Sequence, residues 1–109
     1  MKGEPDEKKA ILLQLASLLE PRRKILEEID KKLANNLFFM FNNVQIRHNN
    51  CDSTDKGKYR EVVDKMSSDE LEQWYDETYQ MCLLAFLEID NIDRSERVDK
   101  LKEQINNTK

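Results

Sequence analysis

Apolar residues recur at three- and four-residue steps along most of the chain, which is the spacing of amphipathic helices. A first helix is predicted from Pro5 to Leu19, because proline suits the first helical turn and apolar positions follow it at helical spacing. Pro21 ends this helix, since it cannot donate to the helical hydrogen-bond ladder. A second helix is predicted from Arg22 to His48, with a core stripe of Ile25, Leu26, Ile29, Leu33, Leu37, Met40, Phe41 and Val44.

The middle of the chain contains the one clear loop, at residues 49–57, where polar residues and a glycine replace the apolar pattern. A short helix is expected within residues 59–66. Ser67 and Glu70 then match a capping box, in which the serine hydroxyl accepts from the backbone N–H three residues later. This signal opens a third helix, predicted over residues 68–90.

The C-terminal segment after Asn91 is predicted to form a separate final helix. Ser95 offers a side-chain oxygen that suits the start of this helix. We expect the apolar residues that follow to face the core, and these are Val98, Leu101 and Ile105.

Composition favours one small all-α domain. The chain has 109 residues, and only two glycines and two prolines interrupt its helices. We therefore expect a four- to five-helix antiparallel bundle over residues 1–109, with frayed ends at 1–5 and 106–109. Hydrophobic residues make up 39% and charged residues 37%, which excludes a disordered chain and a membrane protein. Without a secretory signal, Cys51 and Cys82 are expected to be reduced thiols of a cytoplasmic protein.

Two of the predicted helices carry more apolar residues than one core stripe requires. On the second helix, the residues outside the stripe are Phe38, Phe39 and Ile46. On the third helix, the residues opposite the core face are Leu83, Leu84 and Leu87. A helix that is apolar nearly all round must be covered on both sides, and soluble monomers seldom expose patches of that size. We therefore expect a homodimer, or a complex with another protein, formed through these faces.

Metal and cofactor chemistry have little support in the sequence, and neither is expected. His48 is the only histidine, and with Cys51 it supplies only two of the four ligands that structural zinc takes. Residues 52–57 carry a glycine at the sixth place of a calcium-type loop, but Val63 stands where a bidentate glutamate is required. The two glycines stand alone, so no Gly-rich phosphate loop exists.

Arg47, His48 and Asn49, at the end of the second predicted helix, are the candidate catalytic residues. An arginine on the core side costs desolvation unless it is paired, and the expected partner is one of Glu70, Glu72 or Asp76. One interpretation is structural, because cations and asparagine both suit a helix C-terminus. The other is a cleft in which Arg47 binds phosphate while His48 transfers a proton, since histidine titrates near neutral pH.

The segment from Asn42 to Asp90 resembles HEPN domains, including those of bacterial abortive-infection and toxin–antitoxin systems. The similarity rests on Arg47-His48-Asn49 at the end of a long helix and on the later amphipathic helix. HEPN domains are helical bundles that commonly dimerise, and many are metal-independent ribonucleases. The resemblance therefore implies RNA as a substrate. The family pattern places its arginine several residues before the histidine, whereas here the two are adjacent.

Two functions compete on this basis. The leading hypothesis is a cytosolic helical-bundle interaction or regulatory protein that self-associates through its surplus apolar faces and is not an enzyme. The alternative is a HEPN-like metal-independent ribonuclease or nucleotide-binding component of a defence system, with Arg47, His48 and Asn49 at its site. A bacteriocin-immunity-type four-helix bundle also fits the size. No membrane partner is expected.

Overall fold

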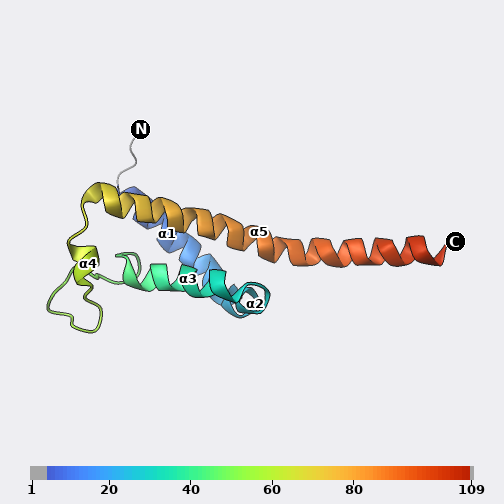
Figure 1. Cartoon of the computed structure of the whole chain (residues 1–109), viewed down its shortest axis with the longest axis horizontal. Coiled ribbons are helices and arrows are strands. Elements are labelled where there is room, and N and C mark those ends of the chain that lie inside the picture. The colour runs from blue at the N-terminus through green and yellow to red at the C-terminus, as the bar shows by residue number, and fades with distance from the viewer. Residues whose placement is uncertain (1–4, 109) are drawn as a thin grey trace.

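The structure is a computed structural model, which describes residues 5–108. Its elements in chain order are α1 (Pro5–Leu19), the 3₁₀ helix η1 (Glu20–Arg22), α2 (Arg23–Ile29), α3 (Lys31–Asn43), α4 (Glu61–Asp64) and α5 (Ser68–Asn107). The described residues contain no strand, so the all-α prediction is confirmed. The elements are far from equal in length, because α5 alone takes 40 residues and dominates the molecule (Figure 1).

Helix α5 is continuous where two helices were expected. Its N-cap is Ser67, whose hydroxyl accepts from the backbone N–H of Glu70 at 3.1 Å, as the capping box predicts. Asn91 and Ser95 do not interrupt the helix, and the Asn91 amide instead lies 3.4 Å from the Ser95 hydroxyl one turn later. The prediction of a separate final helix is therefore wrong. No glycine or proline follows Gly57, so nothing in this segment breaks a helix once it has started.

The second predicted helix is wrong in its bounds, because it is broken twice. Asp30 separates α2 from α3 with φ −155° and ψ 82°, and its carboxylate accepts from the N–H of Leu33 at 3.1 Å. This side chain is the N-cap of α3. The other break follows Asn43, where α3 ends, and Gln45 has a left-handed φ of 54°. A residue in that conformation cannot continue a right-handed helix, so the chain turns away before His48.

The core lies where α1 and α3 pack against the first half of α5 (Figure 1). The core side chains are Leu12, Ala16, Leu19, Leu26, Leu33, Ala34, Leu37, Phe38, Phe41, Ile46, Tyr75, Cys82 and Ala85. Lys8 fastens α1 to α5 at the edge of this core, with its Nζ 2.9 Å from Glu72 and 2.7 Å from Asp76. Phe38 and Ile46 belong to the core, so the expectation that they lie outside it is wrong.

The last part of α5 leaves the rest of the molecule. We call residues 93–107 the arm and residues 5–92 the body. Every residue of the arm is exposed, and Figure 1 shows it projecting beyond the other helices, so that the molecule measures 68 × 34 × 18 Å. The prediction that apolar residues of this segment face the core is wrong for Val98, Leu101 and Ile105, which are 45%, 53% and 58% exposed.

The expected frayed ends fall partly within the described residues. Pro5 begins α1, and Asn106 and Asn107 belong to the last turn of α5. Residues 1–4 and 109 lie outside the part of the chain that the structure describes.

Candidate functional site

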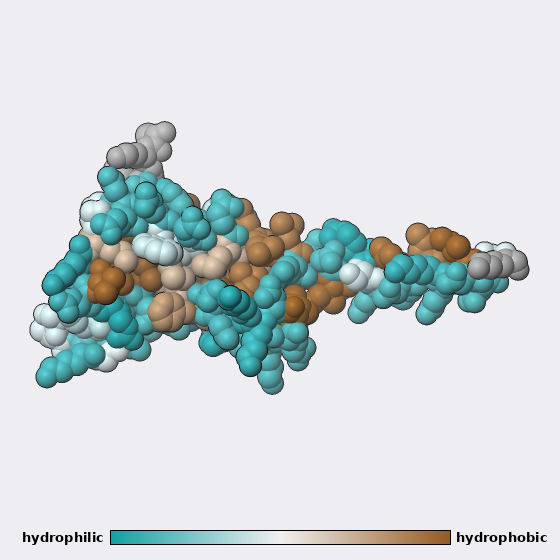
Figure 2. Space-filling model, in the orientation of Figure 1, coloured by the Kyte–Doolittle hydropathy of each residue, from teal (hydrophilic) through white to brown (hydrophobic). Residues whose placement is uncertain are grey.

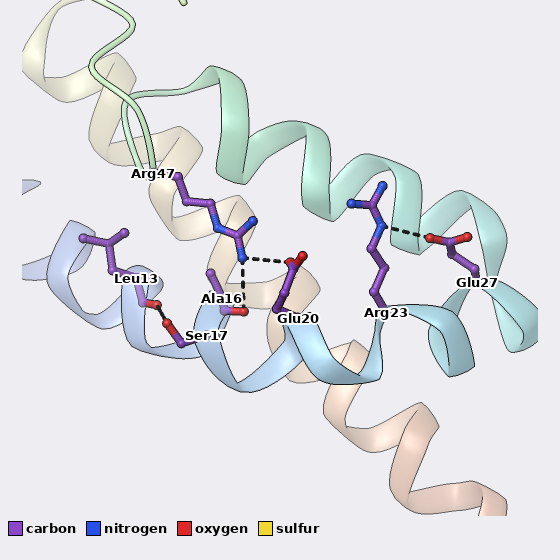
Figure 3. Close-up of polar contacts among 7 residues, drawn as sticks. All are labelled: Leu13, Ala16, Ser17, Glu20, Arg23, Glu27 and Arg47. Carbon is purple, nitrogen blue, oxygen red and sulfur yellow. Dashed lines mark hydrogen bonds and ion pairs between the residues drawn. The ribbon is translucent and has the colours of Figure 1, made fainter.

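Arg47 links the end of α3 to the end of α1. Its Nη2 lies 2.9 Å from a carboxylate oxygen of Glu20 and 3.5 Å from the carbonyl oxygen of Ala16 (Figure 3). The guanidinium also lies 5.9 Å from the ring centre of Phe38 and 5.7 Å from that of Phe41. Such cation–π contacts attract a cation to the ring faces. Arg47 is therefore held by an ion pair and two rings.

The acidic partner of Arg47 differs from the expected ones. The expectation named residues of the third predicted helix, but Glu72 and Asp76 pair with Lys8 across α1 and α5. The actual partner, Glu20, lies in η1. That pairing became possible because α3 ends early and the following residues turn back toward α1.

A second arginine beside Arg47 is neutralised in the same way. Arg23 lies with its guanidinium 4.6 Å from the ring centre of Phe38, and its Nε donates to Glu27 at 2.9 Å (Figure 3). Each of the two guanidiniums thus has its own carboxylate. Each carboxylate engages one nitrogen of its guanidinium, so the ion pairs lower the attraction of both arginines for an anion such as phosphate.

His48 and Asn49 do not join Arg47 at a common point. The amide oxygen of Asn49 accepts from the side chain of Gln45 at 2.9 Å and from the N–H of Cys51 at 3.1 Å. Within residues 5–108, no hydrogen bond joins the side chain of His48 to Arg47 or Asn49. The three candidates are adjacent in the chain, but the hydrogen bonds of Arg47 lead to α1 and η1, whereas those of Asn49 stay within its own loop.

Asn50 is the residue of this segment that the sequence analysis missed. Its side chain is fully buried, accepts from the N–H of Gln45 at 2.7 Å, and donates to the carbonyl oxygens of Asn42 and Lys58 at 3.2 and 2.7 Å. A buried amide that satisfies several backbone groups fixes a loop. The preference of asparagine for turns pointed to this loop, but nothing marked Asn50 apart from Asn49.

The two thiols are poor candidates for chemistry at neutral pH. Burial raises the pKa of Cys82 to about 12. Burial, and then the charge of Asp64, also raises the pKa of Cys51. Because the thiolate is the reactive form, both shifts disfavour a nucleophilic cysteine. Among residues 5–108, no three histidine, cysteine or acidic side chains are grouped so that they could hold a metal ion.

An exposed apolar row runs along α5 on the side away from the core. It includes Leu84 and Leu87 in the body, which are 46% and 64% exposed, and it continues with Val98, Leu101 and Ile105 in the arm. We call these five residues the α5 stripe. Leu83 lies beside it and is 39% exposed. Figure 2 shows apolar surface over the middle of α5 and again towards its far end.

Phe39 lies on a separate surface of the body. It is exposed together with Val62 and Trp74, and these residues line a groove of about 270 Å³ between α3, α4 and the start of α5. We call this surface the Phe39 groove. Of the six residues expected to form an interface, the exposed ones are therefore Phe39, Leu83, Leu84 and Leu87.

Comparisons with known proteins add no functional information to the contacts and exposed surfaces described above. No model of a protein family, no curated protein and no solved structure matches this chain. Within residues 5–108, no helix combines the length and the apolar character that crossing a lipid bilayer requires.

Proposed function

We propose that this protein is an interaction module that self-associates through the α5 stripe. The observation that carries the proposal is the arm, which is exposed on every side while Val98, Leu101 and Ile105 share one of its faces. A helix of about 15 residues without tertiary contacts is marginal in water. A partner that covers this face supplies the missing contacts and removes the apolar row from solvent.

The ribonuclease alternative has less support. Arg47 and Arg23 are each paired with a carboxylate, and within residues 5–108 no hydrogen bond joins His48 or Asn49 to Arg47. An RNA degradation assay that compares the wild type with Arg47→Ala and His48→Ala tests this alternative. RNA cleavage by the wild type that both substitutions abolish would favour the enzyme.

We also propose a reducing compartment such as the cytoplasm. Both cysteines are free, and Cys82 is enclosed in the core, where a disulfide partner cannot reach it. Structural disulfides form in oxidising compartments, so two unpaired thiols favour a reducing one.

The Leu87→Asp variant tests self-association. Leu87 is 64% exposed in the single chain, so a charge there costs the isolated fold little. In an interface the same carboxylate would have to be buried without a partner. Size-exclusion chromatography with light scattering at micromolar concentration should give a dimer for the wild type and a monomer for Leu87→Asp. The helical circular dichroism signal per residue should be similar for the two proteins.

Matched controls place the same charge elsewhere. Val62→Asp changes an apolar residue that is 74% exposed on α4, and Phe39→Asp changes one that is 60% exposed on α3. Both variants should remain dimeric. Dissociation by Phe39→Asp but not by Leu87→Asp would move the interface to the Phe39 groove, and a monomeric wild type would contradict self-association.

A further inference from the structure

The exposed side of α5 follows a seven-residue repeat. With heptad positions lettered a to g and Leu84 placed at a, the a positions are Leu84, Asn91, Val98 and Ile105, and the d positions are Leu87, Arg94 and Leu101. Residues at a and d form the seam along which two helices pack in a coiled coil. The seam is apolar at both ends and polar in the middle.

The seam faces away from α1 and α3, and Ile29 of α2 lies beside it, where it lines one hollow with Leu87, Asn91 and Arg94. The residues that α5 buries occupy positions b and f, and they are Tyr75, Thr78, Cys82 and Ala85. At 3.6 residues per turn, the centre of these positions lies about 150° from the centre of a and d. A second helix can therefore lie along the seam without displacing α1 or α3.

We propose that the helix covering this seam is α5 of a second copy of this chain, antiparallel, with Asn91 opposite the partner's Arg94. This inference rests on the proposed self-association. In an antiparallel pair each a residue faces a d residue of the other helix. The register then places Leu84 opposite the partner's Leu101. Two polar layers lie at the centre, because the symmetry of the dimer repeats each pairing.

Apolar layers lie on both sides of the centre, and the outermost layer sets Ile105 opposite the partner's Gln80. Leu87 faces the partner's Val98, next to the layer of Leu84, and these side chains are about half exposed in the single chain. Residue 107 lies level with the partner's residue 78, so the helices overlap over roughly 45 Å at 1.5 Å per residue. Each arm thus covers residues 78–92 of the other α5. The two bodies lie on the outer sides of this helix pair.

Charge complementarity selects the antiparallel direction. Asp90 and Arg97 occupy g positions, and in this register Asp90 lies beside the partner's Arg97 twice in the dimer. In a parallel pair, Arg94 would face the partner's Arg94 inside the seam. Arg97 would also lie beside the partner's Lys102. Like charges at such positions destabilise a coiled coil, whereas opposite charges favour the pairing.

A shift of the antiparallel register by one heptad, in either direction, removes the pairing of Asp90 with the partner's Arg97. One shift sets Asn91 against the partner's Leu101 and brings Arg97 beside the partner's Arg97. The opposite shift sets Arg94 against the partner's Leu84 and brings the two Asp90 side chains together. Both shifts bury a polar group against an apolar one, which costs free energy unless it is hydrogen-bonded. The register with Asn91 opposite Arg94 keeps the central layers matched and brings no like charges together at the g positions. Its apolar–polar contact, Ile105 opposite the partner's Gln80, lies at the outer end of the overlap.

Charge exchange at Asp90 and Arg97 tests this geometry. We expect Asp90→Arg and Arg97→Asp each to raise the dimer dissociation constant about tenfold, because each replaces two attractive pairs by two repulsive ones. The double variant should return close to the wild type. Asp90 also lies 2.9 Å from Arg94 of its own helix, and the double variant leaves that pair broken. A dissociation constant of the double variant close to that of the wild type would therefore show that residues 90 and 97 are in contact between the chains.

Analytical ultracentrifugation at low salt measures these constants. The controls are Glu96→Arg and Lys100→Asp, which make the same charge changes at positions f and c, away from the seam. Both should leave the dissociation constant within about twofold of the wild type.

The outcomes separate the two proposals. A monomeric wild type overturns both the self-association and the register. A dimer that Arg97→Asp tightens is parallel, because the new carboxylate would then face the partner's Lys102. A dimer that the double variant fails to restore has another register or another surface. Either of these last results keeps self-association and overturns the antiparallel pairing.

Discussion

The body half and the arm of α5 differ in what surrounds them, although they belong to one helix and share one apolar row. Residues 68–92 bury one side against α1 and α3, where Tyr75 and Cys82 are almost completely covered. Residues 93–107 have no such neighbour and are exposed throughout. We therefore expect fold stability and the proposed association to depend on opposite sides of the same helix, and each to respond to its own substitutions.

The largest expected effect is on the buried side of the body half. Tyr75 is 1% exposed, and its hydroxyl donates to the carbonyl oxygen of Gln45 at 2.7 Å. Tyr75→Ala should lower the free energy of unfolding by about 3–5 kcal/mol, because it leaves a large cavity. Urea denaturation measures the change. Tyr75→Phe keeps the ring and should cost only about 1 kcal/mol. A loss below that value for Tyr75→Ala would contradict the assignment of this side to the core.

A truncation in the arm should act on association alone. Leu101→Ala should weaken the dimer about 100-fold, since two leucine side chains are lost from the interface. The melting temperature of the dilute monomer should stay unchanged, because Leu101 is 53% exposed there. Melting curves at two protein concentrations and light scattering check both statements. Lys100→Ala, one residue away and off the seam, is the control. A lower melting temperature of the dilute Leu101→Ala variant would show that the arm packs on its own body.

A smaller effect is expected at Arg47, which connects elements within the body. Arg47→Ala should lower the free energy of unfolding by about 1–2 kcal/mol, because it removes an ion pair and two cation–π contacts. Glu20→Gln removes only the half-exposed ion pair and should cost less than about 1 kcal/mol. Thermal unfolding followed by circular dichroism measures both. Neither variant should change the dimer dissociation constant, and a change would link Arg47 to the interface.

The smallest effect concerns Glu88, where the body half meets the arm. Burial, and then the charge of nearby Asp30, raises the pKa of Glu88 above its usual 4.5, and its Oε2 is buried without a hydrogen-bond partner among residues 5–108. Because the pKa of Glu88 is higher in the folded state than in the unfolded state, its contribution to the free energy of unfolding is fully present below the unfolded pKa. It is lost as the pH rises through the folded pKa.

Glu88→Gln should therefore raise the melting temperature near pH 7, and its advantage should shrink as the pH falls to about 4. Melting curves at both values test the sign. Glu96→Gln, on the exposed arm, is the control and should show no such dependence. An advantage of Glu88→Gln that grows towards low pH would contradict the assigned shift.

Helix bounds and caps were predicted correctly where they depend only on residues close by in the sequence. The bounds of α1 and the cap at Ser67 match the prediction, because a proline or a capping box acts within one helical turn. The exposure of Leu84 and Leu87 also matches, since both stand opposite the core face of a helix that does form. Their role as an interface stays a prediction.

The failures come from helical spacing applied where the chain is not helical. The apolar pattern continues through Asp30, which hides the break between α2 and α3. Beyond Asn43, Ile46 was placed on a helical wheel, but the chain turns at Gln45 and buries Ile46 at 2% exposure. The partner of Arg47 is 27 residues away in the chain, and no local spacing relates Arg47 to Glu20.

The sequence by itself determined that the chain is helical, where α1 lies, where α5 begins and that Leu84 and Leu87 stand opposite the core face of α5. Only the tertiary structure decided that α5 continues past Asn91 and that Val98, Leu101 and Ile105 do not return to the body. The physical reason is that periodicity defines which residues share a face of a helix. It does not define what covers that face, because burial depends on the position of other elements in space.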